Sequence, residues 1–119
     1  MTRATDAVGR YGERVAARTV IAAGMLILDR NWRCAEGELD IIALDGTTIV
    51  FCEVKTRRGD GFGTPVEAVN HVKVRRLRTL AARWLAAHPG VRGEIRFDVV
   101  SVLVPLRGAA QVDHIKAAF

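Results

Sequence analysis

The chain has 119 residues with a net charge of +5; half of the residues are apolar and 26% are charged, a composition typical of a globular protein with one hydrophobic core. The longest apolar run, Val20 to Leu28, is far shorter than the roughly 20 residues of a membrane-spanning helix. Met1 to Arg10 lacks the order of a signal peptide, and two cysteines are too few for a disulfide framework or a clustered zinc site. We therefore expect one cytoplasmic domain over residues 1–119, without a membrane segment.

The predicted elements begin with a helix and a strand. From Asp6 to Ala23, small and apolar residues recur at three- and four-residue spacing, which is the pattern of an amphipathic helix. Arg10, Arg14 and Arg18 share the opposite side of this helix. The next segment, Met25 to Arg33, is first apolar and then mixed, and it suits a first strand.

Two further strands are predicted to form a hairpin. Gly37 to Leu44 is rich in apolar residues, and Thr48 to Thr56 is rich in β-branched and aromatic residues. Asp45-Gly46, between these two segments, is a strong signal for a tight turn. The glycine-rich, charged segment from Arg57 to Thr64 is predicted to be a loop.

The second half of the chain predicts a helix followed by strands. Apolar residues recur along one side of Pro65 to His88, which predicts a long helix with a break near Asn70. Arg96 to Val104 is the expected fourth strand, and Gln111 to Ile115 is a candidate edge strand. The order α-β-β-β-α-β, with a helical crossover between the third and fourth strands, predicts an α/β fold. Its mixed sheet would contain one parallel pair and be flanked by helices.

Basic residues concentrate between Glu53 and Arg92, where nine of them are opposed by only three acids. This asymmetry favours a polyanionic partner, because neutralising phosphates releases counterions. A solvated basic helix face is the alternative reading of the same pattern. The candidate phosphate contacts are Arg57, Arg58, Lys73, Arg75, Arg76 and Arg78.

The predicted hairpin brings acidic residues together. With a two-residue loop at Asp45-Gly46, Asp40 faces Phe51; with a four-residue loop, Asp40 faces Glu53 directly. Both registers place Asp40 on the same sheet face as Glu53, because side chains alternate with period two. A three-residue loop would place them on opposite faces. Lys55 shares the face of Glu53.

Two neighbouring carboxylates repel each other, and burial increases the cost. A bound Mg²⁺ would resolve this conflict, because it takes carboxylate and water oxygens as ligands. Lys55 would then orient or deprotonate a water, or stabilise negative charge during attack on a phosphate. The alternative is a cross-strand ion pair at a sheet edge. The chain has only three lysines against fifteen arginines, which favours a specific need for an ammonium at position 55.

Two other glutamates are candidates for this site. Gly12 could let the first helix approach the sheet and bring Glu13 to the metal as a further carboxylate. A solvated Glu13 beside an arginine is the alternative interpretation. Glu38 shares the face of Asp40 in an ideal strand, as a secondary ligand or, the reading we favour, as a charge at the end of a hairpin.

Four segments carry a resemblance to a known family: Gly12-Glu13, Gly37 to Ala43, Phe51 to Arg57 and Glu67 to Leu77. They resemble the YraN-like family of small bacterial proteins. That family is similar to a branch of the PD-(D/E)XK nuclease superfamily near the archaeal Holliday-junction resolvases. The resemblance extends over nearly the whole chain and implies a restriction-endonuclease-like fold, although Leu39 stands where the superfamily usually has a proline.

The resemblance also implies roles for individual residues. Asp40, Glu53 and the backbone carbonyl of Val54 would bind Mg²⁺ or Mn²⁺. Lys55 would be the catalytic lysine. Glu13 would match a helical carboxylate of the resolvase-like members and join the metal site.

Three functions are compatible with these expectations. The first is a metal-dependent endonuclease acting on DNA, with branched or repair intermediates as substrates and, by analogy with resolvases, a homodimer as the active form. The second is a non-catalytic, nucleic-acid-binding accessory protein that keeps the nuclease fold. The third is a nuclease with the same chemistry that acts on RNA.

Overall fold

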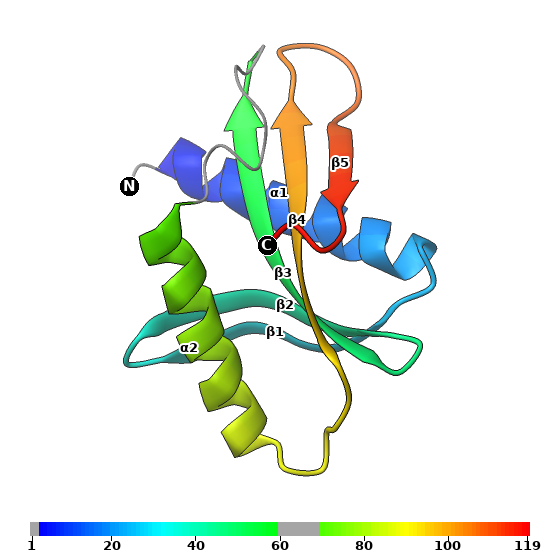
Figure 1. Ribbon diagram of the computed structural model, residues 1–119. Helices are drawn as coiled ribbons and strands as arrows, with labels where there is room; N and C mark the ends of the chain where they lie inside the picture. Colours follow the sequence, from blue (N-terminus) through cyan, green and yellow to red (C-terminus); the bar gives the residue numbers. More distant parts are fainter. Residues whose placement is uncertain (1–2, 60–69) are drawn as a thin grey trace.

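The structure is a computed structural model that describes residues 3–59 and 70–119, with side chains from residue 7 onward (Figure 1). Helices and strands follow one another in the order α-β-β-β-α-β-β. No helix in these described ranges is long and apolar enough to cross a membrane. The elements are α1 (Arg3–Ala22), β1 (Leu26–Cys34), β2 (Gly37–Asp45), β3 (Thr48–Arg58), α2 (His71–Ala87), β4 (Ile95–Val104) and β5 (Gln111–Ile115).

The five strands form one mixed sheet in the order β1-β2-β3-β4-β5. The pair β3–β4 is parallel and the other three pairs are antiparallel. The predicted mixed sheet with flanking helices is therefore confirmed. The candidate edge strand is also confirmed, since β5 has the predicted bounds and pairs with β4.

The two helices cover opposite faces of the sheet, because alternate residues of the central strands pack against different helices. On one face, Ala16 and Val20 of α1 pack with Val50 and Val100 of the sheet. On the other face, α2 packs with a second cluster that includes Phe51. Alternate buried side chains of β3 thus contact α1 on one face of the sheet and α2 on the other.

The β2–β3 hairpin has the register in which Asp40 faces Glu53. Leu44 pairs with Ile49, and the ladder continues to Ile41 and Cys52. Asp45 also pairs with Thr48, so Gly46 and Thr47 make the turn, rather than Asp45-Gly46 or a four-residue loop. Gly46 adopts a φ of 63°, which a glycine tolerates at a tight turn.

Several boundaries differ from the sequence prediction by a few residues, and two of these differences concern the candidate basic residues. Arg57 and Arg58 lie in β3, where they pair with β4, rather than in a loop. Parallel pairing with β4 satisfies their backbone and extends the strand. The second helix begins at His71, with Asn70 as its N-cap, because the Asn70 side chain accepts a hydrogen bond from the Lys73 N–H at 3.0 Å. The part of that predicted helix before Asn70, and most of the predicted loop, lie outside the described residues.

The hairpin strands separate beyond the Ile41–Cys52 pair. From there β2 stays paired with β1 down to Gly37, whereas β3 stays paired with β4 up to Arg58. Figure 1 shows β1 and β2 curving away from β3 and β4 at this point. We call the gap between Asp40 on β2 and Glu53 to Lys55 on β3 the fork.

Candidate active site

Asp40 lies at the fork and bridges the two separating strands. Its Oδ2 accepts a hydrogen bond of 2.8 Å from the backbone N–H of Val54. Burial raises the pKa of Asp40 to about 7, and the nearby carboxylates of Glu53, Glu13 and Glu38 add to the rise, against the lowering effect of the Val54 hydrogen bond. The charged form of Asp40 is therefore disfavoured below about pH 7 unless another positive charge compensates it.

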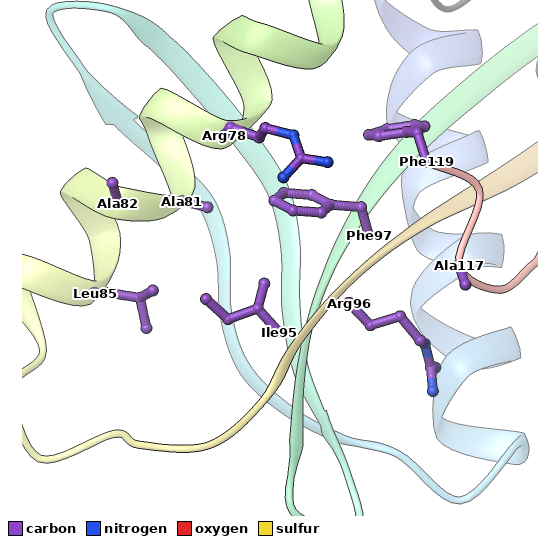
Figure 2. Close-up of a pocket in the computed structure, with 9 residues that line it drawn as sticks. All are labelled: Arg78, Ala81, Ala82, Leu85, Ile95, Arg96, Phe97, Ala117 and Phe119. Carbon is purple, nitrogen blue, oxygen red and sulfur yellow. The ribbon is translucent and has the colours of Figure 1, made fainter.

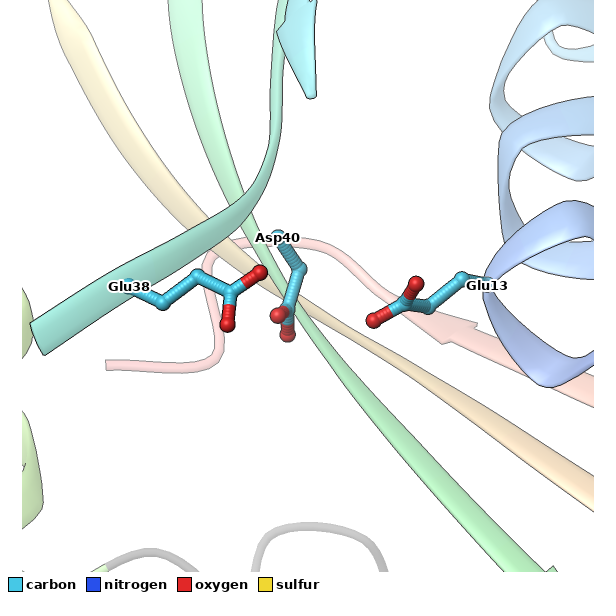
Figure 3. Close-up of side chains that lie close together, drawn as sticks. All are labelled: Glu13, Glu38 and Asp40. Atoms are coloured by element: carbon cyan, nitrogen blue, oxygen red, sulfur yellow. The ribbon is translucent and has the colours of Figure 1, made fainter. Parts of the chain in front are cut away.

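Three carboxylates meet at this point. Oxygen atoms of Glu13, Glu38 and Asp40 all lie within 4.8 Å of one another. Figure 3 shows Glu13 reaching from the α1 side toward Asp40, with Glu38 on the other side along β2. Glu38, which the sequence favoured as a charge at a hairpin end, also pairs with Arg33 at 3.1 Å. It is thus both a hairpin-end ion pair and a member of the carboxylate cluster.

Neighbouring charges act on Glu13 in opposite directions. Burial, followed by the Glu38 carboxylate, raises the pKa of Glu13. Arg30, a hydrogen bond with the Asn31 side chain, and Arg33 lower it. The cluster is therefore an acidic site with arginines within electrostatic reach on the β1 side.

Gly12 explains how α1 comes close enough to deliver Glu13. It is buried against Thr56 of β3. A Cβ atom at position 12 would lie only 2.8 Å from the Cβ of Thr56 and would also overlap the Thr56 hydroxyl and methyl groups. The close approach predicted from Gly12 is therefore present, since a larger side chain would push α1 away from the sheet.

Glu53 lies outside the cluster of three carboxylates and contacts two lysines instead. Its Oε1 lies 3.4 Å from the Lys55 Nζ and 3.9 Å from the Lys73 Nζ. The proximity of Lys55 is the largest cause of a lowered pKa at Lys73, and partial burial adds to it. Asp40 and Glu53 follow directly after the last pair of the ladder, Ile41 and Cys52, and Glu53 is the acid that raises the Asp40 pKa most. The fork thus carries a carboxylate cluster beside a pair of lysines.

The backbone of Val54 faces the same gap. Within an extended strand, the N–H and C=O groups of one residue point to the same side of the strand. The Val54 N–H points to Asp40, so the Val54 carbonyl is directed toward the fork as well. The backbone position predicted as a metal ligand therefore lies on the side of the carboxylates.

Comparison with known proteins places the chain in a family. The pattern described as "Uncharacterised protein family UPF0102" matches residues 12–102. The chain belongs to the UPF0102 family. It is 59% identical to a UPF0102 protein of Kineococcus radiotolerans over 114 residues, covering 95% of this chain and 93% of that relative. It is 56% identical to a UPF0102 protein of Frankia alni over 117 residues, covering 98% of each chain. The assignment to the YraN-like family is confirmed.

The basic residues that the sequence predicts as one set of phosphate contacts lie at several separate places in the structure. Lys73 lies at the fork beside Glu53, and Arg76 lies on the same flank of α2, next to Gly37. Arg78 instead lies over the ring of Phe97, 5.4 Å from its centre. Arg57 is partly buried in β3, whereas Arg58 and Arg75 are exposed.

Arg78 borders a groove that shares no residue with the carboxylate cluster. Figure 2 shows it between α2, the start of β4 and the C-terminal segment, with Phe97 and Phe119 beside Arg78. Its volume is about 380 Å³. Most of its lining is apolar, with Arg78 and Arg96 as its charged residues.

His114, for which no sequence pattern predicted a role, lies in a buried network. Asp98, fully buried on β4, accepts hydrogen bonds from Arg96 at 2.8 and 2.9 Å and from the Ala117 N–H at 3.0 Å. The His114 Nε2 lies 2.8 Å from the Asp98 Oδ2. The sequence did contain one sign of this network, namely an aspartate inside the otherwise apolar strand Arg96 to Val104. A buried carboxylate requires hydrogen-bonding or charged partners. This network fastens the C-terminal segment to β4.

Proposed function

We propose that this chain is a divalent-metal-dependent nuclease of the PD-(D/E)XK type that hydrolyses phosphodiester bonds of DNA. The single observation that carries the proposal is the fork itself. There, the Glu13, Glu38 and Asp40 carboxylates lie within 4.8 Å of one another, next to Glu53 and its two lysines. Acids, lysines and a raised aspartate pKa in one place are typical of catalytic sites rather than of structural ion pairs.

The donor set fits a hard divalent cation. Mg²⁺ prefers oxygen ligands at about 2.0–2.1 Å, so oxygens on opposite sides of one ion are about 4 Å apart. The oxygens of Glu13, Glu38 and Asp40 would need only small side-chain movements to share such an ion. A cation would also offset the mutual repulsion that contributes to the raised pKa of Asp40. Glu53 and the Val54 carbonyl would supply further ligands once these side chains have moved toward the ion.

Each side chain at the fork would have its own role in hydrolysis. A bound Mg²⁺ or Mn²⁺ supplies Lewis acidity, which polarises a phosphate oxygen and activates water. Lys55, held at 3.4 Å by Glu53, would orient the attacking water, accept its proton or stabilise the charge that develops on the phosphate. As the water oxygen bonds to phosphorus, the bond to the leaving sugar oxygen breaks. Lys73 would bind the phosphate from the α2 side.

The test compares cleavage by the parent protein with cleavage by Asp40→Asn and Lys55→Ala variants. Branched, duplex and single-stranded DNA, and RNA, are each incubated with Mg²⁺ or Mn²⁺ and with EDTA. Lys116→Ala is the matched control. The Lys116 side chain is more exposed than that of Lys55, and it lies 3.8 Å from Asp45 rather than at the fork. We expect metal-dependent cleavage of DNA by the parent and the control, and its loss in both fork variants.

Other outcomes identify the alternatives. Salt-sensitive binding of nucleic acid without cleavage would favour a non-catalytic accessory protein. Cleavage confined to RNA would indicate the same metal-dependent hydrolysis with RNA, rather than DNA, as the substrate. Cleavage that persists in Lys55→Ala and Asp40→Asn would contradict the assignment of the fork as the active site.

A further inference from the structure

A second basic surface lies on the other side of the molecule from Arg78, between α1 and β1. A cavity of about 360 Å³ is lined there by Arg14, Ala17, Arg18, Ile21 and Arg30, and we call it the arginine groove. All three arginines are exposed, and Ile21, a large apolar residue, is 56% exposed. The groove therefore combines an apolar floor with a cationic border.

The arginines of this groove have no ion pair with an acid among the described side chains. Arg14 has a ring contact with Tyr11 at 5.8 Å. Arg10 and Arg14, like Arg14 and Arg18, are four residues apart on one side of α1, a spacing at which like charges destabilise a helix. The acid on β1, Asp29, accepts a hydrogen bond from the Trp84 indole N–H on the opposite face of the sheet. The positive charge is thus left for an external anion.

The arginine groove adjoins the carboxylate cluster. Glu13 precedes Ala17 by one helical turn, so both lie on the same flank of α1. Arg30 lies close enough to Glu13 to lower its pKa. An extended polyanion that follows the groove would therefore lead directly to the acidic residues at the fork.

We propose that the arginine groove binds the sugar-phosphate backbone of the DNA substrate and guides it to the fork. Arg14, Arg18 and Arg30 contact phosphates, and Ala17 and Ile21 contact the apolar side of a sugar. This inference rests on the proposed nuclease function, and it assigns backbone binding to α1 and β1, in addition to the predicted basic residues of β3 and α2. It explains why three arginines surround one apolar patch, although none of them forms an ion pair with an acid among the described side chains.

The test measures binding of a fluorescent DNA duplex at several salt concentrations, with EDTA present so that cleavage plays no part. The groove variant carries Arg14→Gln, Arg18→Gln and Arg30→Gln. The control carries Arg92→Gln, Arg107→Gln and Lys116→Gln, three exposed cations outside the groove. Each variant lowers the net charge of +5 by the same three units. Thermal melting confirms that both variants are folded.

We expect the groove variant to bind at least about tenfold more weakly than the control. The slope of log K against log salt should fall by about 2 to 3, since each lost phosphate contact contributes about 0.9. Equal weakening in the two variants, an unchanged slope, or no binding by the parent would overturn the proposal. Cleavage assays keep the two claims apart: binding through the groove without metal-dependent cleavage refutes the nuclease alone, and cleavage with groove-independent binding refutes the groove alone.

Discussion

The Asp40 carboxylate accepts a hydrogen bond of 2.8 Å from the Val54 N–H, across the gap where β2 and β3 separate. This contact holds the Asp40 carboxyl group at the fork, where burial and three neighbouring glutamates raise its pKa. The strands separate after Ile41 and Cys52, so a side chain rather than a ladder carbonyl receives this backbone donor. The separation of the hairpin is thus what makes room for the site.

Replacement of Asp40 by asparagine should stabilise the metal-free protein above neutral pH. The asparagine side chain retains an oxygen acceptor for the Val54 N–H but has no charge to bury. The folded pKa of Asp40, about 7, exceeds its ordinary value of 3.8, so the stability of the parent falls as pH rises from about 4 to about 7. Melting temperatures in EDTA should therefore differ little at pH 4 and most at pH 8. The same pH dependence in both proteins would contradict a raised pKa at this position.

Divalent metal should stabilise the protein more strongly as pH rises, because Mn²⁺ or Mg²⁺ must displace the proton from Asp40. At ten times Kd the expected gain is about 1.4 kcal/mol, which corresponds to a rise in Tm of roughly 5 °C for a chain of this size. Glu38→Gln should reduce the gain, whereas Glu94→Gln, an exposed residue outside the cluster, should not. Equal gains in these two variants would exclude Glu38 as a ligand.

Alanine at Gly12 should push α1 away from β3, because the added Cβ overlaps Thr56. The expected cost is about 1–3 kcal/mol in the free energy of unfolding, together with weaker metal binding as Glu13 moves away. Gly9→Ala is the matched control, since nothing lies within 4 Å of a Cβ there, and it should stabilise the helix by up to about 1 kcal/mol. Chemical denaturation of both variants measures this difference, and similar effects at the two glycines would disprove the close-approach argument.

The buried network at the C-terminus should contribute to stability without affecting the fork. Burial opposes ionisation of Asp98, but hydrogen bonds from Arg96, His114 and Ala117 outweigh it and lower the Asp98 pKa. Its contribution is therefore present above the ordinary pKa of an aspartate and lost in acid. Asp98→Ala should cost about 3–5 kcal/mol, because Arg96 loses its buried partner.

The exposed Asp113 is the control for this network, and Asp113→Ala should change the free energy of unfolding by less than about 0.5 kcal/mol. Metal binding by a folded Asp98→Asn variant should equal that of the parent. A loss of metal affinity in that variant would show that the two sites are coupled.

Local patterns in the sequence predicted most of the fold. The apolar alternation of β2 and β3 predicted the hairpin, and Gly12 predicted the close approach of α1 that brings Glu13 to Asp40. Long-range relationships were not encoded in such patterns. Glu38 lies beside Asp40 as its place on β2 predicted, whereas Lys73 of α2 comes within 3.9 Å of Glu53 of β3 through the packing of the chain. Strand alternation relates Glu38 to Asp40, but no sequence spacing relates Lys73 to Glu53.

The nucleic-acid surface shows the same limit. A run of basic residues in the second half of the chain indicated one binding face, but α2 directs Lys73 and Arg78 to different flanks. Arg14 and Arg18 were placed correctly on the outer side of the first helix. Their relation to Arg30 depends on the packing of α1 against β1, which no local pattern specifies.

The most direct test of the central claim is to locate Mn²⁺ by its anomalous X-ray scattering in crystals of the protein at pH 8. We predict a peak at the fork, with an Asp40 oxygen and oxygens of Glu13 or Glu38 within about 2.2 Å of the ion. The peak should be absent from crystals of the Asp40→Asn variant. Mn²⁺ bound elsewhere, or no ordered ion between these carboxylates, would contradict the assignment of the fork as a metal-dependent active site.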